Sequence, residues 1–121
     1  MNEAKVIQLF QTFSLTEDPR KYRDLIAAAV QKVRGELRDG ADENDPRLYL
    51  YAAACANLQY RRIIAAGNVT PTFAGTSADG RTAYDPCALA EQLMITYRAA
   101  AAPLLRDDAF VFLRTGGMQS D

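Results

Sequence analysis

Cysteines and carboxylates are the side chains of this 121-residue sequence that could carry out chemistry, because the sequence contains no histidine. Without histidine there is no Ser-His-Asp or Cys-His catalytic arrangement and no histidine-containing metal site. Cys55 and Cys87 are the two cysteines, and two separated cysteines cannot supply a four-thiolate zinc site within one chain. In a reducing compartment each is expected to be a small, buried apolar group.

The carboxylates are densest in a short stretch between two expected helices, but they lack the ligand spacing of a calcium loop. This stretch contains Asp39, Asp42, Glu43 and Asp45. A solvated linker that ends in a helix cap explains it. Residues 75–80, GTSADG, are small and polar but do not match a phosphate-binding loop, so a turn is expected there. The sequence therefore favours a protein with no catalytic residues, no cofactor and no metal. An enzyme built from carboxylates and a divalent metal is a weaker alternative.

The bulk composition excludes further classes of protein. A net charge of −1 gives no overall basic field that would attract nucleic acid or an anionic membrane. The longest apolar-rich stretch, residues 48–66, is interrupted by polar residues and is not expected to span a membrane. The first ten residues lack the apolar run of a secretory signal, so a cytoplasmic protein is expected.

Three Asp-Pro dipeptides predict where the main helices begin, because aspartate caps free N–H groups and proline suits the first helical position. They are Asp18-Pro19, Asp45-Pro46 and Asp85-Pro86. A short amphipathic helix over residues 3–13 is expected before the first of them. The following helices are expected over residues 19–39, with Gly40 as a left-handed stop, over 46–67, and from 86 to about Pro103.

The helix over residues 46–67 is apolar on nearly every side, which is typical of a helix at the centre of a bundle. Its alanines allow neighbouring helices to approach closely, and its tyrosine hydroxyls need partners wherever they are buried. The sequence therefore predicts a mainly α protein. We expect a single-domain bundle of three to four helices over residues 1–115, with a small β-hairpin or strand element and a flexible tail over residues 116–121.

Two stretches favour extended chain. Residues 69–84 are rich in threonine and contain a strong turn dipeptide, which predicts a β-hairpin or an irregular loop. Residues 110–113, FVFL, have strong strand propensity. This strand either completes a small sheet with the hairpin within the chain or pairs with another subunit. The candidate interface residues are Asp79, Gly80, Phe110, Val111, Phe112 and Leu113.

The order of the elements is suggestive as well. The chain begins with a short leading helix and a second helix. These are followed by LYLYAAACANLQYRRIIAAG at residues 48–67, by a β-prone insertion and by ALAEQLMITYRAAAAPLLRDDAFVFLR at residues 88–114. This order, from Tyr22 to Leu113, resembles the head-to-tail connector (adaptor) proteins of tailed bacteriophages and prophages. The chain departs from that pattern in its threonine-rich insertion and in the proline within its last helix, which affects the expected ring contacts.

The resemblance implies a structural protein of a phage or prophage that forms a homo-oligomeric ring between portal and tail and extends the DNA channel. It implies contacts with portal and tail-completion proteins and passage of DNA without specific binding. It implies neither catalysis, nor a small-molecule substrate, nor a membrane. The expected location is the bacterial cytoplasm during assembly, and the virion neck if the phage is active.

A small helical regulatory or DNA-associated module is the alternative reading. It would use the basic side chains of the second expected helix, which are Arg20, Lys21, Arg23, Lys32, Arg34 and Arg38. Duplex binding that is tight and falls steeply with salt concentration would favour this alternative over a connector.

Overall fold

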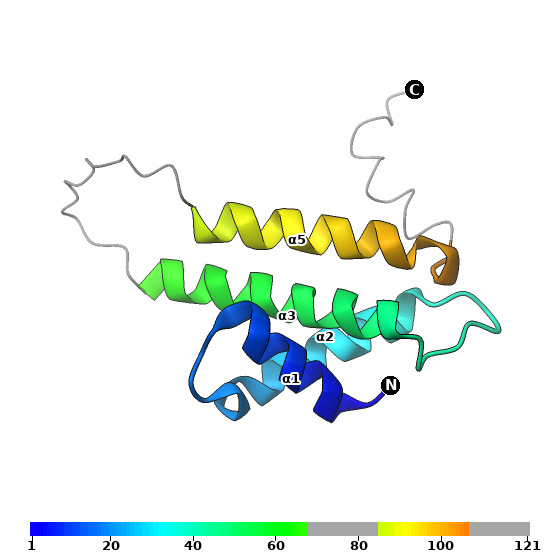
Figure 1. The fold of residues 1–121 in the computed structure, drawn as a ribbon, viewed down its shortest axis with the longest axis horizontal. Helices are drawn as coiled ribbons and strands as arrows, with labels where there is room; N and C mark the ends of the chain where they lie inside the picture. Colours follow the sequence, from blue (N-terminus) through cyan, green and yellow to red (C-terminus); the bar gives the residue numbers. More distant parts are fainter. Residues whose placement is uncertain (68–84, 107–121) are drawn as a thin grey trace, which may run out of the picture.

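The computed structural model describes residues 1–67 and 85–106, which form four α-helices and two short 3₁₀ segments (Figure 1). The elements are α1 (Glu3–Ser14), η1 (Pro19–Tyr22), α2 (Arg23–Glu36), α3 (Pro46–Gly67), α5 (Pro86–Ala101) and η2 (Ala102–Leu104). The mainly α fold class is confirmed. The hairpin expected over residues 69–84, the strand expected over 110–113 and the boundary expected at 115 lie outside the described residues.

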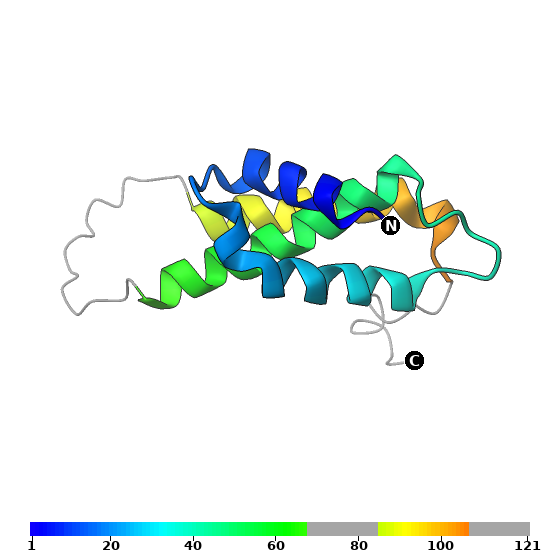
Figure 2. The same cartoon turned by 90° about the horizontal axis from the view of Figure 1, so that it is seen from below.

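Helix α3 lies at the centre of the bundle. Helix α5 runs antiparallel beside it, and α1 and α2 pack on other sides of it (Figures 1 and 2). The buried residues of α3 are Leu48, Tyr51, Ala52, Ala53, Ala54, Cys55, Ala56, Asn57 and Leu58. The eight consecutive positions from Tyr51 to Leu58 are buried, so neighbours cover every side of the helix here. The expected central role of this helix is confirmed for its first half.

The neighbouring helices contribute apolar stripes to one core. Helix α2 buries Ile26, Ala29, Val30 and Val33, which recur at spacings of three and four residues. Helix α1 buries Val6 and Phe10 at a spacing of four. Burying each large side chain of this kind stabilises the fold by roughly 1.5–3 kcal/mol. The leading helix is therefore held by packing, as expected for a short amphipathic segment.

Two of the three Asp-Pro caps form as expected. The carboxylate of Asp45 accepts a hydrogen bond from the Arg47 N–H at 2.9 Å, and that of Asp85 accepts one from the Cys87 N–H at 3.0 Å. Asp18 makes no side-chain cap, and Pro19 opens a 3₁₀ turn that precedes α2. The predicted α-helical start at residue 19 is therefore wrong by one turn.

The end of α2 also differs from the expectation. The helix ends at Glu36, and Gly40, with φ of +84°, lies in the loop beyond it. Leu37 is extended because it forms an antiparallel bridge with Leu105. The Arg38 N–H donates to the Leu104 carbonyl at 3.0 Å, and the Arg106 N–H donates to the Glu36 carbonyl at 2.8 Å. This bridge joins the chain after α5 to the end of α2.

The expected end of the last helix is confirmed. Helix α5 reaches Ala101, and Pro103 lies in η2, the short 3₁₀ segment that follows it. The Pro103 ring fits the start of a 3₁₀ segment but would clash inside an α-helix. None of the helices in the described part of the chain has the length and apolar character needed to cross a membrane.

Candidate functional site

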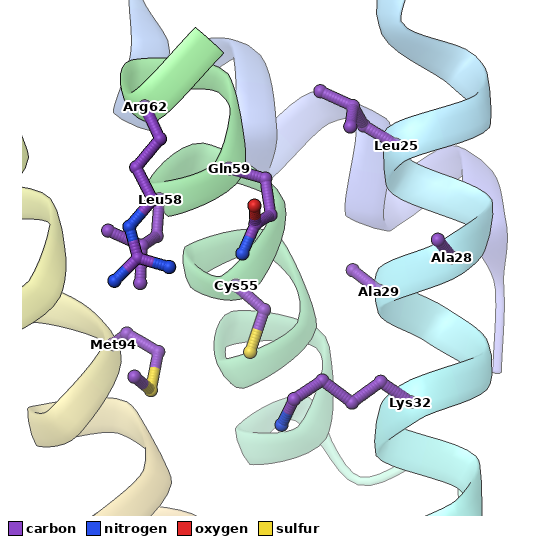
Figure 3. Close-up of a pocket in the computed structure, with 9 residues that line it drawn as sticks. All are labelled: Leu25, Ala28, Ala29, Lys32, Cys55, Leu58, Gln59, Arg62 and Met94. Carbon is purple, nitrogen blue, oxygen red and sulfur yellow. The ribbon is translucent and has the colours of Figure 1, made fainter. Parts of the chain in front are cut away.

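An open groove runs between α2 and α5, with α3 as its floor (Figure 3). We call it the α2–α5 groove. Its volume is about 270 Å³. It is lined by Leu25, Ala28, Ala29 and Lys32 from α2, by Cys55, Leu58, Gln59 and Arg62 from α3, and by Met94 from α5.

Small side chains create the space. Ala28 and Ala29 of α2 lie across from Cys55 of α3, so neither helix fills the volume between them (Figure 3). Leu58 and Met94 form the opposite wall. The middle of the groove is therefore mainly apolar, with the Gln59 amide beside Cys55, while Lys32 lies at one end and the exposed Arg62 lies at the other (Figure 3).

A hydrogen-bonded network fixes the Lys32 end of the groove. The Tyr51 hydroxyl donates to Glu36 Oε1 at 2.6 Å. Lys32 Nζ donates to Glu36 Oε2 at 2.8 Å and to the Tyr51 hydroxyl at 3.1 Å. Arg98 Nη2 lies 3.9 Å from Glu36 Oε1, and Arg98 is buried. One carboxylate thus faces two cations and a phenol, and it joins side chains of α2, α3 and α5.

The surroundings of Tyr51 and Cys55 favour their neutral, protonated forms. Burial, and then the hydrogen bond to Glu36, raise the pKa of Tyr51 well above its ordinary value, so its hydroxyl stays a donor. Burial raises the pKa of the Cys55 thiol to about 11. A thiol of that pKa is protonated at neutral pH and is neither a nucleophile nor a metal ligand.

A second surface lies at the end of the α3–α5 pair, where α3 ends and α5 begins. Ile63 is 51% exposed and Leu89 is 53% exposed. Ala65, Ala66 and Ala88, which are close to them in sequence, are also exposed. We call this surface the α3–α5 end. The last turns of α3 project past α1 and α2 (Figures 1 and 2), so those helices do not cover it.

The carboxylates between α2 and α3 form hydrogen bonds and ion pairs in and beside the loop that joins these helices. Asp42 accepts a hydrogen bond from the Asn44 N–H at 2.9 Å, and Glu43 pairs with Arg34 at 3.2 Å. Asp45 pairs with Arg47 at 2.9 Å, and the Arg47 guanidinium lowers the pKa of Asp45 to about 2. The interpretation as a linker with a cap is confirmed. In the described residues, no group of three potential ligands is placed to hold a metal ion.

The basic side chains that a DNA-associated module would use lie in several different environments. Lys32 and Arg34 are paired with Glu36 and Glu43. Arg20 and Arg23 line a small hollow beside Ile7. Arg38 lines another hollow with Asp39, Leu105 and Arg106. Two of these basic side chains are thus already neutralised by carboxylates within the fold.

The sequence-predicted interface residues are not placed by this structure. Asp79, Gly80, Phe110, Val111, Phe112 and Leu113 all lie outside the described residues. The groove residues, by contrast, were not foreseen. Cys55 was expected to be buried, which is confirmed, but its position at the floor of a groove was not anticipated. In the sequence, the three adjacent alanines at residues 27–29 of α2 were the one sign that a groove could form beside this helix.

Comparison with known protein families, with curated proteins and with solved structures finds no match.

Proposed function

We propose that this protein is a structural assembly protein of the head-to-tail connector type, which forms a homo-oligomeric ring between portal and tail. The observation that carries the proposal is the exposed apolar α3–α5 end. The order of helices in the sequence, which resembles that of the connector family, supplies the particular kind of assembly.

Exposed apolar groups that gather at one place mark contact surfaces more often than single exposed side chains do. Ile63 and Leu89 belong to antiparallel helices and lie at the same end of the pair. Covering each of them would remove further apolar area from water, at about 25 cal/mol per Å². A neighbouring subunit, portal or tail protein supplies that cover in the proposed assembly.

The chemistry of the buried groups also supports a binding role. The thiol of Cys55 is protonated, and the Glu36 carboxylate is engaged by Tyr51, Lys32 and Arg98. These groups hold side chains of three helices together. In a connector, such a network would keep the subunit rigid while its outer surfaces make contacts.

The proposal is tested by measuring mass across a range of concentrations, alone and with the portal protein encoded in the same genome. Electron microscopy of the mixture then looks for a ring with a central opening. The I63D/L89D double variant is expected to abolish ring formation while keeping the helical content of the wild type. Q8D/Q31D, which adds the same charge at two exposed positions, is the matched control and is expected to assemble.

Two outcomes would contradict the proposal. A chain that stays monomeric at every concentration, with and without portal protein, is not a connector. Tight duplex binding by the monomer, falling steeply between low and moderate salt, would favour the DNA-associated module instead.

A further inference from the structure

We propose that the α2–α5 groove is the docking site for residues 107–113 of the same chain, with Phe110 in its apolar middle. This inference does not depend on the connector function. It rests on where the chain leaves the described fold, on its direction there, on its length and on its charge.

The bridge between Leu37 and Leu105 places the exit of the chain. It is antiparallel, and Arg106 is held to the Glu36 carbonyl at 2.8 Å. An antiparallel partner runs opposite to the residues it faces, so the chain that passes Leu105 and Arg106 is directed back along α2. Lys32, at one end of the groove, lies one helical turn from Glu36 in that direction.

The spacing of residues beyond Arg106 fits the groove. An extended chain advances about 3.3 Å per residue, whereas α2 rises about 1.5 Å per residue. From a start level with Glu36, Asp108 comes about 7 Å along α2, which is level with Lys32. Phe110 comes about 13 Å along, level with Ala28, and Phe112 comes about 20 Å along, just past the Leu25 end of the groove.

Side-chain alternation puts the suitable groups on one face. In an extended segment, residues two apart point the same way. Asp108, Phe110 and Phe112 therefore share one face, and Asp107, Ala109, Val111 and Leu113 share the other. On the first face the Asp108 carboxylate precedes the rings of Phe110 and Phe112. In the groove, the Lys32 ammonium likewise precedes the mainly apolar middle.

Volume and charge agree with this register. A cavity of about 150 Å³ is large enough to hold benzene, so the groove of about 270 Å³ has room for a phenyl ring. Lys32 carries three N–H donors, of which Glu36 and Tyr51 occupy two, and its side chain is 47% exposed. It can accept a second carboxylate, and Asp108 supplies one.

Methionine methyl NMR on the full chain tests the proposal. The sequence has three methionines, and Met94 lines the groove, so the M94L variant assigns its signal. A phenyl ring in the groove shifts the Met94 methyl signal upfield, and F110A is expected to move that signal downfield. V111A, a truncation on the opposite face, is the matched control and is expected to leave it in place.

Dilution of the wild-type chain shows whether the groove holds residues 107–113 of the same chain or those of a neighbouring copy. The upfield shift is expected to be independent of protein concentration. A shift that grows with concentration would overturn the proposal in favour of docking between two copies. A Met94 signal that is identical in wild type and F110A would overturn docking altogether.

A groove-filling variant provides a second readout that leaves the segment itself intact. Ala28 is exposed, so A28W is expected to fold and to occupy the groove. Displacement of the segment is expected to increase the rate of chymotrypsin cleavage after Phe110 and Phe112 several-fold. Q31W, at an exposed α2 position that does not line the groove, is the control. Equal cleavage rates in A28W, Q31W and wild type would contradict the proposal.

Discussion

The two halves of α3 have different surroundings. From Leu48 to Leu58 the helix is largely buried, whereas from Gln59 to Gly67 most positions are exposed. The second half contains the polar residues Gln59, Arg61 and Arg62, and length is a further reason. Helix α3 has 22 residues and is about 33 Å long, whereas α1, α2 and α5 have 12, 14 and 16 residues and lengths of about 18, 21 and 24 Å. A helix that is apolar all round is thus buried only as far as its neighbours extend.

The largest expected effect comes from truncating one apolar side chain in each half. Leu48 is fully buried, so L48A is expected to lower the free energy of unfolding by about 2–5 kcal/mol. I63A in the exposed half is expected to change it by less than about 0.5 kcal/mol. Denaturant unfolding of the two variants measures the contrast. Similar losses in both would show that the second half is covered within the monomer.

A smaller effect is expected from the network that ties the first half of α3 to its neighbours. E36Q keeps the shape of the side chain but removes the charge that faces Lys32 and Arg98. Because the site is largely buried, the free energy of unfolding is expected to fall by about 1–3 kcal/mol. E43Q, at an exposed ion pair with Arg34, is expected to leave the unfolding midpoint nearly unchanged. Equal effects would mean that burial of the Glu36 network has no energetic importance.

The smallest effect concerns the cap at the start of the buried half. D45A is expected to lower the melting temperature by a few degrees at pH 7, whereas D18A is expected to have little effect because Asp18 makes no side-chain cap. The pKa of Asp45 is lowered from 3.8 to about 2, so its contribution is complete above pH 4 and is lost as the pH falls toward 2. Melting temperatures of wild type and D45A measured between pH 7 and 2 should therefore converge in acid.

Local sequence patterns were sufficient to predict most of the helices. The Asp-Pro dipeptides and the spacing of apolar residues located α1, α3 and α5, and the bounds of α3 were correct. The predictions for α2 failed at both ends. Its end at Glu36 depends on pairing with Leu104 and Arg106, which are distant in sequence, and no local pattern reports such a partner. Its start failed because a proline at the first position is compatible with a 3₁₀ turn as well as with an α-helix.

The candidate surfaces were harder to predict, because each depends on the relative placement of helices. Periodicity indicates which residues share a face, but it does not show that Ala28 lies across from Cys55. It indicated that a buried Tyr51 would need a partner, yet Glu36 became that partner only through packing. The exposed α3–α5 end depends on the relative lengths of the helices, and the helix bounds predicted from the sequence already contain this information.

The bridge between Leu37 and Leu105 has a consequence for local concentration. It anchors Arg106 beside the groove, and short tethers give effective concentrations on the order of millimolar. In the proposed docking, a contact between groove and segment that is too weak to detect between separate peptides would then be substantially formed within one chain. A free peptide with the sequence of residues 107–113 would have to reach millimolar concentrations to compete. Subunits held side by side in a ring would offer each other's segments at comparable concentrations, so exchange between neighbours would cost little free energy in the assembled state.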